Sequence, residues 1–202
     1  MIAIVDYGAG NLNSVKKAFD YLGAEVVVTT QPETVAEADK IVLPGVGHFS
    51  ALSGLDNSGL RDAVLQGVRA GKPFFGICLG MQWLFEGSDE APELAGAGLF
   101  AGRCRQFPSS VKSPHVGWNS LAVREGSRLL RNIAPDSFVY YTHSFQAPVV
   151  AATTAATEYG AQFSAAVERD NIFGVQFHPE KSWTVGLIIL KNFCEVNFRE
   201  VR

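Results

Sequence analysis

The stretch Pro73-Phe74-Phe75-Gly76-Ile77-Cys78-Leu79-Gly80-Met81-Gln82-Trp83-Leu84-Phe85 decides the fold, because it carries the chain from a buried strand through a cysteine into a helix. Its first residues form an unbroken apolar run of strand length, and its last residues place apolar side chains at helical spacing. Glycines stand two residues to either side of Cys78, in the pattern G-x-C-x-G. This pattern suits a turn so tight that a β-carbon at either flank would collide with the neighbouring backbone.

Cys78 is therefore a candidate nucleophile. A sharp strand-to-helix turn exposes its sulfur, and the following helix points free N–H groups and the positive end of its dipole toward it. Both effects favour a reactive thiolate. The alternative is a cysteine packed in the core, as a cysteine after an apolar strand often is. The flanking glycines and the strand-to-helix context favour the nucleophile.

Length and composition predict one soluble globular domain over residues 1–202. Hydrophobic residues make up 47% of the chain and charged residues 18%, which is enough apolar material for a sizeable core. The formal net charge is −3, and Lys and Arg form no run. A protein that binds nucleic acid needs clustered Lys and Arg to neutralise the phosphates, so we expect no nucleic-acid partner.

The chain begins directly with a strand-like run, Met1-Ile2-Ala3-Ile4-Val5, without a basic region or a cleavage site, and no apolar stretch reaches membrane-spanning length. We therefore expect a cytoplasmic protein that does not bind a membrane. The cysteines Cys78, Cys104 and Cys194 are widely spaced and form no C-x-x-C pair. This spacing argues against a disulfide framework and against a zinc site, so we expect neither a metal nor a cofactor.

The first half of the chain alternates strands and helices, which predicts an α/β fold with a mostly parallel central sheet flanked by helices. Strands are expected at 2–5, 25–29, 40–43 and 73–77, with helices between them. The loop after the first strand lacks the third glycine of a dinucleotide fingerprint, since Asn13 stands there. In the loop 44–49, Gly45 and Gly47 frame Val46 at the carboxyl end of a strand, where backbone N–H groups would lie near Cys78.

After Phe85 the pattern changes, and the second half is expected to add antiparallel or mixed strands to the sheet. A polar, acidic loop is predicted from Glu86 to Gly98. Further strands are predicted at 103–107, 121–124, 138–141, 151–159 and 172–177, followed by a helix from about 185 to 197. No domain boundary or internal repeat interrupts this half.

A thiolate nucleophile requires a base within hydrogen-bond reach and a third group that orients the base. His178 ends an apolar strand as Cys78 does, whereas His48, His115 and His143 lie in segments that look like turns. Glu180 is two residues beyond His178, so both side chains point the same way on an extended backbone. An isolated His-Pro-Glu is also compatible with an ordinary turn and a solvated glutamate. Together with the cysteine, the three residues predict a Cys-His-Glu triad.

Two of these segments, Gly76-Ile77-Cys78-Leu79-Gly80-Met81-Gln82 and Phe177-His178-Pro179-Glu180, closely resemble class I (triad) glutamine amidotransferases. Other segments resemble, within that class, the glutaminase subunits of imidazole glycerol phosphate synthase. The resemblance covers essentially the whole chain. The segments are Asp6-Tyr7-Gly8-Ala9-Gly10-Asn11-Leu12, Pro44-Gly45-Val46-Gly47-His48-Phe49, Pro114-His115-Val116-Gly117-Trp118-Asn119, Tyr141-Thr142-His143-Ser144-Phe145 and Gln176-Phe177-His178-Pro179-Glu180-Lys181-Ser182.

The resemblance implies hydrolysis of glutamine to glutamate and ammonia by Cys78, His178 and Glu180. It also implies that the backbone N–H of Leu79, with one from Val46 or Gly47, stabilises the oxyanion. The glutamine's amino-acid end is expected to contact five residues. These are Gly47, Gln82, Glu90, Ser144 and Phe145. Many relatives have Tyr at the position of Phe145, and for Glu90 the alternative is an ordinary loop carboxylate.

The resemblance further implies a partner, a (β/α)₈-barrel cyclase subunit that joins the ammonia to a nucleotide and yields imidazole glycerol phosphate and an aminoimidazole carboxamide ribotide in histidine biosynthesis. The residues expected at that interface are Asn11, Trp118, Asn119 and Lys181. The alternatives are a solvated surface side chain for Lys181 and a core position for Trp118.

Three other functions stay open at this point. The first is a glutaminase subunit of a different synthase, and the second is a stand-alone cysteine hydrolase or peptidase on a similar sheet. The third is a non-catalytic glutamine-sensing module, which an intact Cys-His-Glu set makes hard to defend.

Overall fold

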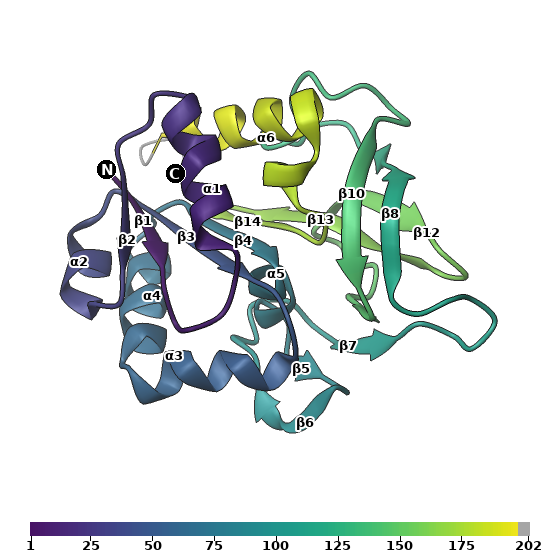
Figure 1. The fold of residues 1–202 in the computed structure, drawn as a ribbon, viewed down its shortest axis with the longest axis horizontal. Helices are drawn as coiled ribbons and strands as arrows, with labels where there is room; N and C mark the ends of the chain where they lie inside the picture. The colour runs from purple at the N-terminus through teal and green to yellow at the C-terminus, as the bar shows by residue number, and fades with distance from the viewer. Residues whose placement is uncertain (198–202) are drawn as a thin grey trace.

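An eight-stranded sheet forms the centre of the computed structural model, which describes residues 1–197 (Figure 1). The last five residues of the expected domain, 198–202, lie outside the described residues. In spatial order the strands are β2 (Val26–Thr29), β1 (Ile2–Val5), β3 (Lys40–Gly45), β4 (Phe74–Cys78), β14 (Ile172–Val175), β13 (Gln162–Arg169), β12 (Thr153–Glu158) and β9 (Ala122–Val123). Neighbours from β2 to β14 are parallel, and β13, β12 and β9 continue the sheet antiparallel.

Helices cover both faces of the parallel half (Figure 1). One layer contains α1 (Leu12–Tyr21) and α6 (Trp183–Glu195), and the other contains α2 (Pro32–Glu37), η1 (Phe49–Leu52), α3 (Ser53–Asn57), α4 (Leu60–Arg69) and α5 (Leu79–Trp83). The side chains of β1 alternate between two cores: Ile2 and Ile4 join the core under α1 and α6, whereas Ala3 and Val5 join the other. This is the α/β architecture expected from the sequence.

Two smaller sheets extend the second half of the chain. In the first, β8 (His115–Ser120) pairs antiparallel with β10 (Phe138–His143), and we refer to this pair as the ribbon. In the second, the order is β11 (Phe145–Gln146), β7 (Arg103–Gln106), β5 (Gly87–Ser88) and β6 (Ala91–Ala95). Figure 1 shows the ribbon beside β12 and β13, on the opposite side of the molecule from the N-terminus.

The structure corrects several expected elements. The segment from Glu86 to Gly98 is not only a loop, because β5 and β6 lie in it. His115 and His143 do not lie in turns, because His115 begins β8 and His143 ends β10 of the ribbon. Trp118 also lies on β8. The strand β13 was not expected, and the strand predicted at 121–124 is reduced to the two residues of β9. The last helix, α6, begins and ends two residues earlier than predicted.

None of the helices in the described part of the chain is long and apolar enough to span a bilayer.

Candidate active site

Cys78 ends β4 and immediately precedes α5, as the G-x-C-x-G pattern predicted. Its φ is 54°, in the left-handed region that a non-glycine residue adopts only under constraint. A β-carbon on Gly76 would lie 2.5 Å from the Gly80 carbonyl oxygen, and one on Gly80 would lie 1.8 Å from the Leu43 carbonyl oxygen. Both flanking glycines are therefore required for this turn.

His178 follows β14, the parallel neighbour of β4, and this pairing brings it beside Cys78. Glu180 lies in the short helix η2 (Pro179–Lys181), and its Oε1 is 2.9 Å from His178 Nδ1. Both side chains are 2% exposed. Because a carboxylate only accepts, His178 Nδ1 carries the hydrogen of this bond. Glu180 thus fixes the orientation of the ring.

The other ring nitrogen of His178, Nε2, is buried and makes no hydrogen bond with the described residues. It is therefore available to exchange a proton with the neighbouring sulfur. Burial alone lowers the pKa of His178, but the charge of the neighbouring Cys78 and the Glu180 carboxylate, which accepts from Nδ1, outweigh burial and raise that pKa to about 10. The arrangement favours the imidazolium form of His178.

Cys78 opens into a cavity of about 240 Å³, a size suited to a ligand smaller than a typical drug molecule. All five residues expected to contact glutamine line it. The lining comprises Gly47, Cys78, Leu79, Gln82, Glu90, Pro114, Thr142, His143, Ser144 and Phe145. Glu90 is held at the edge of the cavity by a hydrogen bond of 2.8 Å, which its Oε2 accepts from the backbone N–H of Phe49. Leu79 and Gly47, two of the expected oxyanion residues, face the cavity, whereas Val46 is not among its lining residues.

Gln176 contacts the nucleophile, and sequence reasoning gave it no role. Its Nε2 donates to Cys78 Sγ at 3.7 Å, and its Oε1 accepts from Gln82 Nε2 at 3.1 Å. The same Gln82 amide donates to the Phe145 carbonyl oxygen at 2.8 Å. The sequence did contain a signal for this contact, because Gln176 directly follows an apolar strand and precedes His178 by two residues. A glutamine at such a position is expected to be buried, and a buried amide must find hydrogen-bond partners.

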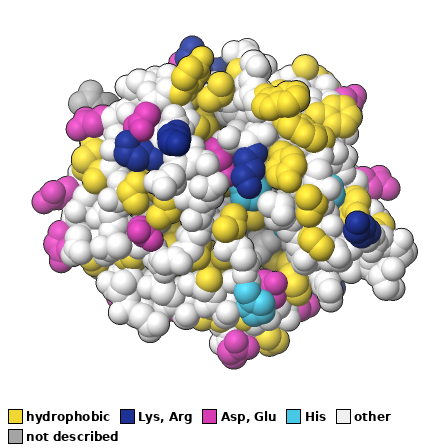
Figure 2. All heavy atoms as spheres, in the orientation of Figure 1, with side chains coloured by type: hydrophobic (Ala, Val, Ile, Leu, Met, Phe, Trp, Pro, Cys, Tyr) yellow, Lys and Arg dark blue, Asp and Glu magenta, His cyan; other side chains and the backbone are white. Residues whose placement is uncertain are grey.

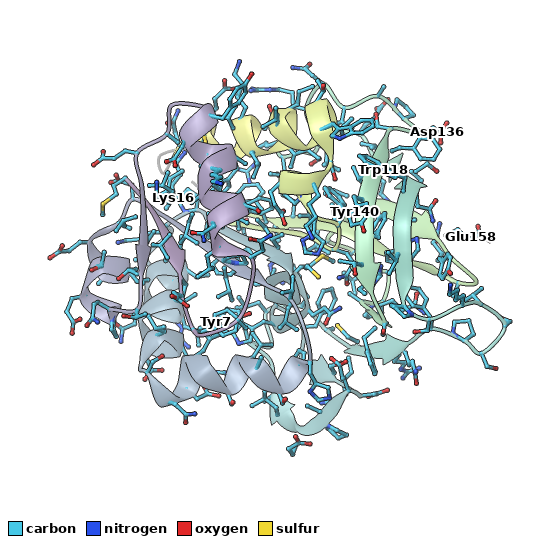
Figure 3. The ribbon with its side chains drawn as sticks, viewed as in Figure 1. Tyr7, Lys16, Trp118, Asp136, Tyr140 and Glu158 are labelled. Atoms are coloured by element: carbon cyan, nitrogen blue, oxygen red, sulfur yellow. The ribbon has the colours of Figure 1, made fainter. Side chains whose placement is uncertain are left out.

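Three of the residues expected at a partner interface, Trp118, Asn119 and Lys181, lie on or beside the ribbon. Trp118 is 40% exposed, so it is not a core residue, and its ring centroid is 4.8 Å from that of Trp183. Lys181 Nζ lies 5.8 Å from the ring centroid of Tyr140, and Figure 3 shows Trp118 and Tyr140 on neighbouring strands of the ribbon. Asn119 is half-buried at the same ribbon, and Asn11 caps α1 by accepting from the backbone N–H of Ser14.

Exposed apolar side chains gather at this side of the molecule, over the ribbon and the start of α6 (Figure 2). Phe138 is 57% exposed and Trp183 is 79% exposed, and they flank Trp118 along a groove of about 390 Å³. Trp183 has a φ of 47°, which places a bulky residue in the left-handed region. A contiguous exposed aromatic surface beside a buried polar site is typical of a protein–protein contact.

Neither of the other two thiols lines the cavity. Cys104 and Cys194 are free, and burial raises the pKa of both. A buried thiol of raised pKa is a poor nucleophile. Within residues 1–197, no three His, Cys, Asp or Glu side chains are grouped so that they would hold a metal ion.

Comparison with known proteins agrees with this geometry. Residues 3–196 match the family model of glutamine amidotransferase class-I. The imidazole glycerol phosphate synthase subunit HisH of Methanothermobacter thermautotrophicus is 48% identical over 198 residues, covering 97% of this chain and 98% of that protein. The subunit HisH of Gloeobacter violaceus is 50% identical over 201 residues, covering 96% and 88%.

Solved structures share the fold at much lower sequence identity. A glutamine amidotransferase crystal structure matches with a TM-score of 0.76 over 96% of this chain and 98% of that one, at 18% identity. The PurLQS structure from Thermotoga maritima matches with a TM-score of 0.73 over 96% of each chain, at 19% identity. The chain belongs to the class-I glutamine amidotransferase family, in the branch that contains the HisH subunits of imidazole glycerol phosphate synthase.

Proposed function

We propose that this chain is the glutaminase subunit of an imidazole glycerol phosphate synthase, and that it passes ammonia from glutamine to a separate cyclase subunit. One observation carries the proposal: a strained cysteine, Cys78, lies beside a buried histidine–glutamate pair and opens into a small polar cavity. The relatives named as subunits of this synthase support the choice of synthase, since they match the chain over nearly its full length.

The first half-reaction forms a thioester. The Cys78 thiolate attacks the carbon of the glutamine carboxamide, and a carbon–sulfur bond forms as the carbonyl electrons move to oxygen. The backbone N–H of Leu79, with one from the Val46-Gly47 segment, stabilises that oxyanion. His178 then gives its Nε2 proton to the nitrogen, the carbon–nitrogen bond breaks, and ammonia leaves.

The second half-reaction releases glutamate. His178, now neutral, takes a proton from water as the water oxygen attacks the thioester carbon. The carbon–sulfur bond breaks, and the Cys78 thiolate and the imidazolium are restored. Throughout, Glu180 holds the ring with Nδ1 protonated, so that only Nε2 exchanges protons with the reacting groups.

The amino-acid end of glutamine carries an ammonium and a carboxylate, and the cavity offers matching groups. Glu90 supplies a carboxylate for the ammonium, and the backbone at Ser144 and Phe145 supplies polar groups for the carboxylate. Gln82 and Gly47 also line the cavity. The absence of a hydroxyl on Phe145 leaves these backbone contacts intact.

The exposed aromatic surface, formed by Trp118, Phe138, Trp183 and Tyr140, is the proposed docking face for the cyclase subunit. Ammonia is protonated in neutral water and then cannot act as a nucleophile, so transfer across a docked interface protects it. Lys181 lies beside this face, Asn119 follows Trp118 on β8, and the family resemblance adds Asn11 to the expected interface. A barrel-shaped cyclase in the cytoplasm is the partner that the family resemblance favours.

The test is glutamate release from glutamine by the purified chain, alone and with the cyclase subunit and its nucleotide substrate. We expect activity that depends strongly on the partner and is abolished by Cys78→Ala. Activity that is high alone and indifferent to the cyclase would contradict the subunit assignment and favour a stand-alone hydrolase. No activity under any condition would contradict the glutaminase itself.

A further inference from the structure

Two buried histidines that the triad does not use lie between the proposed docking face and the cavity. His115 on β8 and His143 on β10 are directly opposite each other in the ribbon, with His115 Nδ1 3.2 Å from His143 Nε2. Side chains alternate across a strand, so these residues share the inner face of the ribbon, while Trp118 and Tyr140 share its outer face. The inner face packs on the aromatic core around Phe107 and Phe163, and the inner end of the ribbon reaches the cavity through His143.

At the outer end of this pair, Asn119 fixes which nitrogen of His115 carries hydrogen. Asn119 Oδ1 accepts a bond of 2.8 Å from the Ser120 backbone N–H, and Asn119 Nδ2 donates to the Glu158 carbonyl oxygen at 3.1 Å. These two contacts set the orientation of the amide. Its Nδ2 also lies 3.4 Å from His115 Nε2, so that ring nitrogen accepts.

At the inner end, Phe145 fixes the hydrogen on His143. The Phe145 carbonyl oxygen only accepts, and it lies 2.9 Å from His143 Nδ1, so Nδ1 carries the hydrogen. His143 Nε2 is then an acceptor, and the hydrogen between the rings belongs to His115 Nδ1. Each ring thus carries one hydrogen and no charge, and all bonds run in one direction from Asn119 to Phe145.

Burial agrees with this neutral state. Desolvation lowers the pKa of His115 to about 4. Burial also lowers the pKa of His143, to about 3. The neighbouring His115 and His178 lower this pKa further, whereas the hydrogen bond to Phe145 raises it and only partly offsets burial. Neither ring is charged at neutral pH, so the pair acts through hydrogen bonds and position rather than through titration.

The bonds continue from Phe145 to the nucleophile. The same carbonyl oxygen accepts from Gln82 Nε2 at 2.8 Å, Gln82 also donates to Gln176 Oε1 at 3.1 Å, and Gln176 Nε2 donates to Cys78 Sγ. The carbonyl of Phe145 is thus shared by His143 and by an amide that lines the glutamine cavity. A shift of His143 displaces the acceptor on which Gln82 depends.

Aromatic packing gives the pair little freedom to rotate. His115 is stacked between Tyr141 and Tyr159, with ring centroids 4.8 Å and 4.0 Å away and interplanar angles of 22° and 17°. His143 lies with its ring edge-on to Phe107, at a centroid distance of 5.0 Å. A displacement of the ribbon would therefore move both rings together rather than break their bond.

We propose that Asn119, His115 and His143 form a hydrogen-bonded relay that transmits the position of the ribbon to Phe145 and Gln82, and so sets the glutamine cavity when the partner docks. His115 and His143 are positioning residues, since they act on substrate through Phe145 and Gln82. The inference rests on the proposed function, because its signal is the docking of a cyclase subunit.

Two substitutions test the relay in the complex with the cyclase subunit and its nucleotide. Asn119→Asp keeps the acceptor for Ser120 but removes the Nδ2 donor, and His115→Phe keeps the stacking but removes both ring nitrogens. We expect each to raise the KM for glutamine about 10-fold, which is the scale of leaving a buried polar group unpaired. In the double variant we expect no further rise, because one broken link interrupts the whole relay.

Tyr141→Phe is the matched control. It removes a buried hydrogen bond of 2.7 Å to Thr157 Oγ1 from the same aromatic cluster, outside the relay. We expect lower stability and an unchanged KM. If Tyr141→Phe raises the KM as much as His115→Phe does, or if the effects of the two relay variants add, the relay is wrong and the histidines only support the fold.

A second readout needs no activity. Long-range ¹H–¹⁵N NMR spectra of the free chain should show both His115 and His143 with hydrogen on Nδ1, with no titration between pH 5 and 8. Hydrogen on Nε2 of either ring, or a titration in that range, would overturn the relay. A wild-type complex that releases no glutamate would instead overturn the proposed function, so the two failures are distinguishable.

Discussion

Cys78 is held in the left-handed region by contacts on both sides of it. Its backbone passes between Gly76 and Gly80, and the missing β-carbon of Gly80 leaves room for the Leu43 carbonyl oxygen. Strain of this kind, about 1–3 kcal/mol at a non-glycine residue, persists only where the surroundings fix it. Here the surroundings include the interior strands β3 and β4, which pair up to Gly45 and Cys78.

We predict that Gly80→Ala destabilises the chain and impairs glutamine hydrolysis. The new β-carbon would lie 1.8 Å from the Leu43 carbonyl oxygen, and this clash can be relieved only if the backbone of Leu43 or of residue 80 moves. We expect a loss of about 1–3 kcal/mol in the free energy of unfolding, measured by denaturant titration. Gly67→Ala is the control, since its β-carbon meets only the end of the Ile41 side chain and a helix favours alanine. Equal stability of the two variants would contradict the tight turn.

We also predict that Glu180→Gln shifts the alkaline limb of the pH–rate profile to lower pH. The pKa of His178 is raised to about 10, so its imidazolium persists below that pH and is lost as pH rises through it. Because Glu180 is one of the groups that raise this pKa, its neutral replacement lowers the pKa and narrows the active range. kcat should also fall, by up to about 10⁴-fold.

The measurement is kcat/KM for glutamine against pH in the complex, with Glu168→Gln as control. Glu168 is a buried carboxylate paired with Arg128, it does not line the cavity, and it is not among the groups that shift the pKa of His178, so its replacement should leave the alkaline limb in place. An alkaline limb that Glu180→Gln does not move would show that the carboxylate does not act on His178.

The grouping of Cys78, His178 and Glu180 could be expected from the sequence, because its signals are local: the glycine spacing around Cys78, and the two-residue separation of His178 and Glu180. The residues around the cavity were expected only from the resemblance to glutamine amidotransferases. Gln176 and His143 were not predicted. Their roles depend on hydrogen bonds between residues 94 and 98 positions apart, and on the pairing of two ribbon strands. No pattern along the chain encodes such contacts until the strands are in place.

At the scale of elements, the ribbon connects the exposed aromatic surface to the triad. The backbone N–H of His178 donates to the Tyr140 carbonyl oxygen at 2.9 Å. Ser182 Oγ donates to the His178 carbonyl oxygen at 2.7 Å and accepts from the Tyr140 backbone N–H at 3.0 Å. Strand β10 is thus hydrogen-bonded to the segment that carries His178, the proposed catalytic base.

We predict that Trp118→Ala and Trp183→Ala weaken binding of the cyclase subunit. Exposed tryptophans at the centre of an interface commonly contribute about 2 kcal/mol or more, a loss of about 30-fold in affinity. The measurement is titration calorimetry with the cyclase, and both variants should remain folded because these rings are exposed. Val149→Ala, at another exposed apolar residue, is the control. Unchanged affinity of both tryptophan variants would place the docking face elsewhere.

The strands that sequence analysis missed have weak patterns for physical reasons. In β8, histidine, glycine and asparagine occupy the inner face, so the usual apolar alternation of a strand is missing. In β13, the buried residues are mostly small, Ser164, Ala165 and Ala166, and they lack the β-branched character that marks a strand. Both strands form because their neighbours in the sheet pair with them.

At the scale of the whole molecule, the order of the strands ties the two halves of the chain together. β14, near the end of the chain, pairs with β4 on one side and β13 on the other. The parallel part of the main sheet, which the first half of the chain forms, is therefore joined to the antiparallel part through β14 from the second half. The alternation of the first half predicted the parallel part, whereas no pattern in the sequence placed β14 next to β4.

We predict that residues 1–202 unfold as one domain. Since β14 joins the parallel and antiparallel parts of the sheet, neither part is complete without the other. Differential scanning calorimetry of the isolated chain should give one cooperative transition. Two separable transitions, or a stable proteolytic fragment that ends between residues 86 and 98, would contradict the single domain.

The proposed hydrolysis depends on a covalent bond between glutamine and Cys78. The most direct test is to mix the complex with glutamine, quench it in acid during turnover, and locate the glutamyl group by peptide mass spectrometry. We expect a glutamyl thioester on the peptide that contains Cys78 and none on the peptides of Cys104 and Cys194. Rapid glutamate release without an adduct on Cys78, or turnover that survives Cys78→Ala, would contradict it.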